Sequence, residues 1–135
     1  MLRLRSLSSV PAVCLLLLAP LALAASGTPQ LQTYFQPELT DATYQQQAYG
    51  KVAVKWKQPG KKGLPAVGRK AVVQAVIGRD GKLISAVVST ESGSKAWDDA
   101  ALAAVKKAAP FPPLPKSFSP PTMDAHFHFA WVAGS

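Results

Sequence analysis

The sequence predicts an α+β domain with the element order helix, strand, strand, helix, strand, in which a three-stranded antiparallel sheet packs against helices. Three observations support this fold class. Apolar side chains recur at helical spacing in two segments, residues 44–56 and 97–108. Two alternating segments, 70–77 and 83–90, flank an Asp-Gly pair that is typical of a tight hairpin turn. A third alternating segment, 122–132, follows a proline-rich stretch and supplies the last strand.

The first 24 residues have the pattern of a secretory signal peptide. Two arginines precede an apolar run over residues 10–21, and Ala22-Leu23-Ala24 fits a small-x-small cleavage site. The alternative is an uncleaved inner-membrane anchor. A spanning helix needs about 20 apolar residues, whereas this run is shorter and contains two prolines. We therefore expect a cleaved signal peptide over 1–24 and an exported protein.

The chain carries a formal net charge of +8 and a single cysteine, Cys14. Cleavage would remove that cysteine, leaving no disulfide, no thiolate nucleophile and no thiolate metal site. The basic charge suggests nucleic acid as a partner, but export and the lack of a base-reading motif argue against it. The positive charge can instead serve solubility or attraction to anionic envelope surfaces.

The segment 25–40 is polar, contains glycine and prolines, and shows no helical period, so we expect a flexible linker there. The folded domain is expected over 41–132. Thr40 or Asp41 can cap its first helix, which should end near Gln58 because Pro59 follows. The apolar face of that helix comprises Tyr44, Ala48, Val52 and Trp56.

A glycine-rich basic loop, 60–69, leads to the hairpin and lacks the spacing of a phosphate-binding P-loop. The first hairpin strand should bury Val73, Ala75 and Ile77. The returning strand should bury Ile84, Ala86 and Val88.

The second helix lies within the segment 92–114 and begins at Ser94, a residue type that caps helices. Aspartates in its first turns and lysines in its last turn match the helix dipole. Its buried stripe comprises Trp97, Ala101, Val105 and Ala108. The prolines between 110 and 115 end the helix, and the extended chain should return Phe111 and Leu114 to the core.

The last strand should bury one face and expose the other. Its apolar face comprises Met123, Ala125, Phe127, Phe129 and Trp131, and Asp124, His126 and His128 lie opposite. Two histidines do not make a zinc site, which needs a third ligand, and Asp124 is the only neighbour available. We therefore predict no metal and no cofactor, and interpret the histidines as exposed polar groups able to respond to pH near 6 to 7.

Catalytic patterns are also missing from the sequence. No serine lies in a Gly-x-Ser-x-Gly motif. Asp98 and Asp99 are neighbours on a helix, where successive side chains diverge by about 100°. We therefore predict that the protein is not an enzyme.

Five motifs together resemble one known family. They are Ser92-Gly93, Trp97 to Leu102 (WDDAAL), Pro110 to Pro115 (PFPPLP), Gly78 to Lys82 (GRDGK) and the alternating strand 123–131. In this order they resemble the C-terminal domain of the TonB/TolA family, periplasmic energy-transducing proteins of Gram-negative bacteria. The resemblance covers residues 44–131. It implies a periplasmic, non-catalytic module that binds a short extended segment, typically from an outer-membrane receptor, as an added strand.

A three-stranded sheet would leave its last strand open for such a segment. Carried over to this chain, the partner-binding edge would be Met123, Asp124, Ala125, His126, Phe127, His128, Phe129, Ala130 and Trp131. Two alternatives stay open. One is a short membrane-anchored transducer that contacts an ExbB/ExbD- or TolQ/TolR-like motor. The other is a structural module of a Tol-type complex that forms a homodimer through the open edge.

Overall fold

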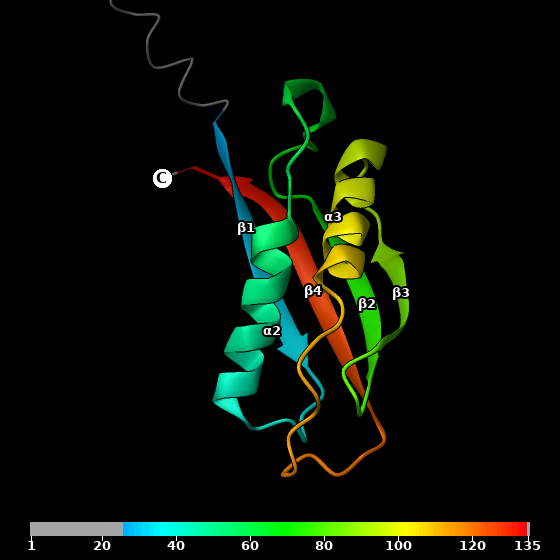
Figure 1. Ribbon diagram of the computed structural model, residues 1–135. Coiled ribbons are helices and arrows are strands. Elements are labelled where there is room, and N and C mark those ends of the chain that lie inside the picture. Colours follow the sequence, from blue (N-terminus) through cyan, green and yellow to red (C-terminus); the bar gives the residue numbers. More distant parts are fainter. Residues whose placement is uncertain (1–25, 135) are drawn as a thin grey trace, which may run out of the picture.

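The computed structural model describes residues 26–134 (Figure 1). The signal peptide and anchor hypotheses concern residues 1–24 and lie outside the described part. The strands and helices, in chain order, are β1 Gly27–Phe35, α2 Ala42–Lys55, a 3-10 turn η2 Lys61–Gly63, β2 Lys70–Gly78, β3 Leu83–Thr90, α3 Lys95–Ala108 and β4 Thr122–Ala133. Among residues 26–134, no helix is both long and apolar enough to cross a bilayer.

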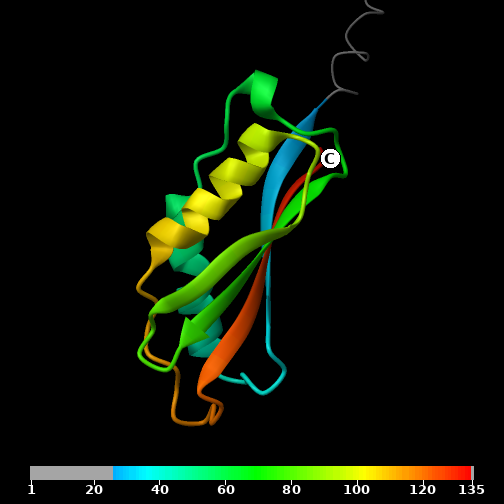
Figure 2. The same ribbon diagram turned by 90° about the vertical axis from the view of Figure 1, so that its right-hand side faces the viewer.

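The four strands form one antiparallel sheet in the order β1-β4-β2-β3. Both helices lie on the same face of this sheet, as the edge-on view in Figure 2 shows. The predicted α+β class and the one-sided helical cover are confirmed. The predicted number of strands is wrong, because the segment expected to be a linker forms β1 and pairs with β4.

The residues of β1 explain both the strand and the failure to predict it. Leu31 and Phe35 turn toward the helices, and Gln30, Gln32 and Tyr34 turn away, which is the two-residue period of a strand. Glycine and proline lie near its start, and because both residue types are depleted in strands, the sequence there does not indicate one. Proline is tolerated here because β1 is an edge strand.

The caps of both helices agree with the sequence. The side chain of Asp41 accepts a hydrogen bond from the Tyr44 N–H at 2.9 Å. The side chain of Ser94 accepts one from the Trp97 N–H at 3.2 Å. The expected stripe of α3 is buried, as are Tyr44, Ala48 and Val52 on α2. Helix α2 ends at Lys55, three residues earlier than expected.

The hairpin between β2 and β3 differs from its prediction at one position. The turn forms at Asp80-Gly81, where Gly81 has a φ of +92° and the Gly78 N–H donates to Lys82 O at 2.8 Å. The pairing contains an irregularity between Val76 and Ile77, after which Leu83 rather than Ile84 lies opposite Ile77. Such a bulge changes which side chains face the core. Ile84 is consequently 60% exposed.

The core lies between the helices and the sheet and is rich in aromatic side chains. Trp97 is fully buried and donates its indole N–H to Phe129 O at 2.8 Å. Trp56 packs edge-on against both Trp97 and Phe129, with centroid distances of 5.3 and 5.0 Å, which supports its predicted core role. Phe111 and Leu114 are buried as expected. These contacts fix β4 firmly under both helices.

Candidate binding surface

Strand β4 lies inside the sheet, between β1 and β2. The prediction that residues 123–131 form an open edge is therefore wrong. Nine residues of β1 pair with β4 on one side, and β2 pairs with it on the other. The predicted binding residues are thus brought together on one strand, but none of their backbone groups lies on a free edge. The affected positions are Met123, Asp124, Ala125, His126, Phe127, His128, Phe129, Ala130 and Trp131.

The backbone of β4 divides its hydrogen-bonding groups between its two neighbours. At the ends of the β1 ladder, the Gln36 N–H donates to Asp124 O at 3.0 Å and the Gly134 N–H donates to Ser26 O at 3.5 Å. Bonded and non-bonded pairs alternate in antiparallel ladders. The backbone N–H and C=O groups of the even-numbered residues of β4 therefore point toward β1. On the other side, the Trp131 N–H donates to Arg69 O at 3.0 Å, so odd-numbered residues face β2.

The same alternation shows which backbone groups of β1 do not pair with β4. Its odd-numbered residues point their backbone groups away from β4, toward the outer edge. Pro29 is one of these residues, so the N–H that proline lacks is one that β4 does not need. At the same time the outer edge of β1 has one donor fewer for pairing with another chain.

The face of the sheet opposite the helices carries the two histidines. His126 lies between Tyr34 of β1 and Gln74 of β2, and His128 lies between Gln32 and Val72. The imidazole of His128 packs against the Tyr34 ring with centroids 4.6 Å apart. Aromatic and polar groups from three strands therefore meet in the middle of this open face.

The environment of His128 favours its neutral form. Partial burial lowers the pKa of this imidazole from its usual 6.5, and the positive charges of Lys70 and His126 lower it further. A neutral imidazole can accept as well as donate a hydrogen bond. His128 is thus a neutral group at pH 7, held within the sheet surface beside Tyr34.

The residues described, 26–134, contain no cluster of three or more His, Cys, Asp or Glu side chains able to hold a metal ion. Asp124 belongs to the same face as the histidines, yet its backbone is engaged with Gln36. The Asp124 N–H donates to the Gln36 side-chain oxygen at 3.1 Å. Asp124 therefore helps to close the end of the β1 ladder.

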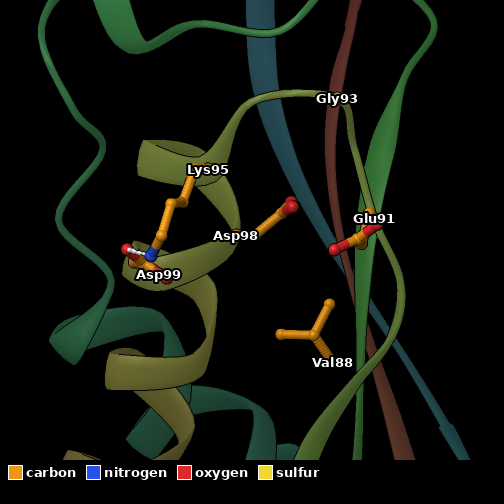
Figure 3. A pocket seen from close by; sticks show the side chains of 6 residues that line it. All are labelled: Val88, Glu91, Gly93, Lys95, Asp98 and Asp99. Carbon is orange, nitrogen blue, oxygen red and sulfur yellow. Dashed lines mark hydrogen bonds and ion pairs between the residues drawn. The ribbon is translucent and has the colours of Figure 1, made fainter.

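A pocket of about 350 Å³ lies where β3 passes into α3, lined by Val88, Glu91, Gly93, Lys95, Asp98 and Asp99 (Figure 3). Asp98 is only 8% exposed and accepts a hydrogen bond from the Ser92 N–H at 2.9 Å. Asp99 instead accepts a hydrogen bond from the Lys95 ammonium group at 2.8 Å. This bond and the negative charge of Asp99 raise the pKa of Lys95. In Figure 3 the two aspartates point in different directions, as their adjacency predicts. Asp98 thus holds the loop before α3, and the pocket presents no nucleophile with a neighbouring base.

Two edges of the sheet lack a neighbouring strand in the described part of the chain, the outer sides of β1 and β3. Strand β3 exposes Ile84 and also Val87, which is 54% exposed. Sequence reasoning missed the first of these edges. The signal for a strand was weak, because Gln32 and Thr33 are both polar and interrupt the alternation that Leu31 begins.

Comparison with known proteins agrees with this architecture. The family model described as TonB C terminal matches residues 41–127, a range that runs from the cap of α2 into β4 and leaves out β1. No curated protein and no solved structure matches the chain. Members of the matched family are non-enzymatic protein-interaction modules with a role in envelope transport. Because the match extends over more than half of the sequence, the chain belongs to the TonB C-terminal domain family.

Proposed function

We propose that this protein is a non-catalytic periplasmic binding module that takes up an extended segment of an envelope protein as an added strand. The partner would be the periplasmic segment of a TonB-dependent outer-membrane receptor or another protein of the envelope. Backbone hydrogen bonds would supply affinity, and alternate side chains would supply selectivity.

One observation carries this proposal. The family-matched part of the chain, 41–127, includes the first half of β4, and β4 pairs over nine residues with β1, which lies outside the match. The side of β4 that faces β1 is therefore shaped to accept an extended antiparallel segment. Along β4, residues whose backbone groups point toward β1 alternate with residues whose side chains, several of them aromatic, are buried, as strand addition requires.

The proposed location rests on the N-terminal 24 residues, whose pattern is that of a cleaved signal peptide. The intact mass of the protein purified from its host separates cleavage from retention. Loss of about 24 residues supports the periplasmic module. A retained N-terminus favours the anchored alternative, in which the segment contacts an ExbB/ExbD- or TolQ/TolR-like motor.

Binding can be tested by titrating the ¹⁵N-labelled exported protein with synthetic N-terminal peptides of outer-membrane receptors from the same cell. Saturable amide shifts in the sheet would support the proposal. A matched control is each peptide with its residues scrambled, which keeps composition and charge. A folded protein whose amides respond to none of the receptor peptides would contradict a receptor-binding role.

A second candidate is self-association, and the outer edge of β3, which has no partner strand among residues 26–134, favours it. This edge carries the exposed apolar side chains Ile84 and Val87, and exposed apolar edges promote pairing with another chain. Sedimentation at several concentrations tests this. Concentration-dependent dimer formation that Val87→Lys abolishes would support a homodimer, and a monomer at all concentrations would contradict it.

A further inference from the structure

We propose that β1 is a built-in occupant of the strand-binding side of β4, and that the partner segment binds by replacing it. This inference rests on the proposed function and adds where the partner binds, which chemistry it needs and what limits its access. In the structure the site on β4 is occupied by the protein's own chain.

The way β1 is held makes it easier to release than either inner strand, β2 or β4. Only one of its nine residues, Leu31, is buried, whereas six residues of β2 are. Its outer edge has no partner strand among residues 26–134, so its departure breaks a single ladder. Strands with few buried apolar contacts open at a lower free energy than the core.

Two hollows that are open to the surface flank β1. One, of about 270 Å³, is lined by Thr33 and by three α2 residues, Gln45, Gln46 and Tyr49. The other, of about 280 Å³, lies at the end of the strand between Tyr34 and His126. Both hollows leave room at the surface for side chains larger than those of β1.

An empty site would be costly, so release of β1 should be coupled to arrival of another strand. Phe127 and Phe129 are fully buried, and β1 covers them through Leu31, Thr33 and Phe35. The rings of Phe35 and Phe127 meet edge-on at 6.4 Å. Departure of β1 would expose apolar surface and the even-numbered backbone groups of β4 to water.

The register of β1 predicts the chemistry of its replacement. The incoming segment runs antiparallel to β4, with an apolar residue opposite Phe129 and an aromatic or large apolar residue opposite Ala125, where Leu31 and Phe35 now lie. The positions between them face the open side of the sheet and accept polar side chains. An unfolded segment of a partner with this alternation fits the site.

The decisive experiment fixes β1 in place with a reversible crosslink. Gln30 and Ala130 lie directly opposite each other and face away from the core. Hydrogen-bonded antiparallel pairs have Cα atoms about 5.5 Å apart, within the range of disulfides. We would make Gln30→Cys and Ala130→Cys in the full chain carrying Cys14→Ser. The control is Gln74→Cys with Val87→Cys, an opposite pair on the same face that joins β2 to β3 and leaves β1 free.

The first probe is a fluorescent peptide with the sequence of residues 26–36, because it fits the site whatever the natural partner is. Tethered β1 competes at an effective concentration on the order of mM, so this peptide should bind the parent protein weakly. Leu31→Ala weakens β1 and should tighten peptide binding about tenfold or more, since the apparent affinity follows the fraction of open sites. Gln30→Ala, at an exposed position of β1, serves as the control and should change little.

The expected results separate exchange from simple docking. The oxidised β1–β4 pair should lose peptide binding, reduction should restore it, and the oxidised β2–β3 control should bind as the parent does. Equal binding by the oxidised and reduced β1–β4 pair would overturn the exchange. A folded Leu31→Ala protein, checked by its amide spectrum, that binds no more tightly than the parent would also overturn it. If the 26–36 peptide exchanges but no receptor peptide binds, the exchange stands and the receptor-binding function fails.

Discussion

The turn at Gly81 offers the sharpest test of how this fold is held together. Gly81 and Gly68 have almost the same backbone angle, with φ of +92° and +91°. Their surroundings differ. A Cβ at Gly68 would meet no atom within 4 Å, whereas a Cβ at Gly81 would overlap the carbonyl oxygen of Phe111. Alanine at the two positions therefore separates backbone strain from steric overlap.

We expect Gly68→Ala to lower the free energy of unfolding by about 1 kcal/mol. The left-handed conformation costs alanine about 1–2 kcal/mol, and the loss of unfolded-state entropy offsets about 0.4–1 kcal/mol of that. The same terms apply to Gly81→Ala, but there the loop around Phe111 must also move.

That movement would break two backbone hydrogen bonds between the loop and the turn. The Phe111 N–H donates to Gly81 O at 2.9 Å, and the Leu114 N–H donates to Arg79 O at 3.0 Å. Each such bond contributes about 1 kcal/mol, and the burial of Phe111 would weaken as well. We expect Gly81→Ala to cost at least about 2 kcal/mol more than Gly68→Ala.

Urea unfolding followed by tryptophan fluorescence measures both variants against the parent. Trp97, fully buried in the core, reports loss of tertiary structure. Gly50→Ala is a useful third variant, because Gly50 lies within α2 with open space around it. Alanine at this position should stabilise the protein by up to about 1 kcal/mol. Equal destabilisation by Gly81→Ala and Gly68→Ala would refute the reasoning, since it would mean that the proline-rich loop does not depend on the turn.

Four further predictions follow, each from a single observation. Tyr44→Phe removes the hydrogen bond from the Tyr44 hydroxyl to Pro112 O, 2.8 Å long, and should cost about 1–2 kcal/mol in the same urea assay. Burial raises the pKa of Tyr44 to about 12, so the phenol should ionise well above pH 10, and the stability that it contributes should be present below pH 10 and lost as pH rises through about 12. Since the pKa of His128 lies below its unfolded value of 6.5, the unfolded chain binds this proton more readily, and thermal stability should fall as pH drops below 6.5, less steeply in His128→Gln. In hydrogen exchange, the β1 amides that face β4 should exchange faster than the β2 amides that face it.

Further measurements can contradict these predictions. For Tyr44 the control is Tyr49→Phe, on the same helix but 40% exposed, and an equal loss in both would contradict a specific role for the bond to Pro112. For His128, replacing Lys70 with Gln should raise the pKa of the imidazole in an NMR titration, because one repelling charge is gone. An unchanged pKa would contradict the assigned cause. Uniform exchange across β1 and β2 would mean that the sheet opens only as a whole.

Local chemistry determined most of the elements of this protein. The helices begin at Asp41 and Ser94 because their side chains cap the first turn. The hairpin forms at Asp80-Gly81 because glycine accepts the positive φ. The alternation of β4 determined which of its side chains are buried, and the order of motifs indicated the family that the comparison with known proteins confirmed.

The arrangement of the strands depended on tertiary structure. The segment 27–35 contains too few buried residues for its pattern to predict a strand. It forms β1 because β4 would otherwise leave backbone groups unpaired along nine positions. The exposure of Ile84 likewise follows from a bulge in the pairing with β2, which no local pattern encodes. Local patterns determine which face of a strand is apolar, but pairing between distant segments determines which strand lies at the edge. For this protein the sequence alone therefore identified the family and the buried face of β4, and only the tertiary structure decided that β1 occupies the side of β4 where we propose that a partner binds.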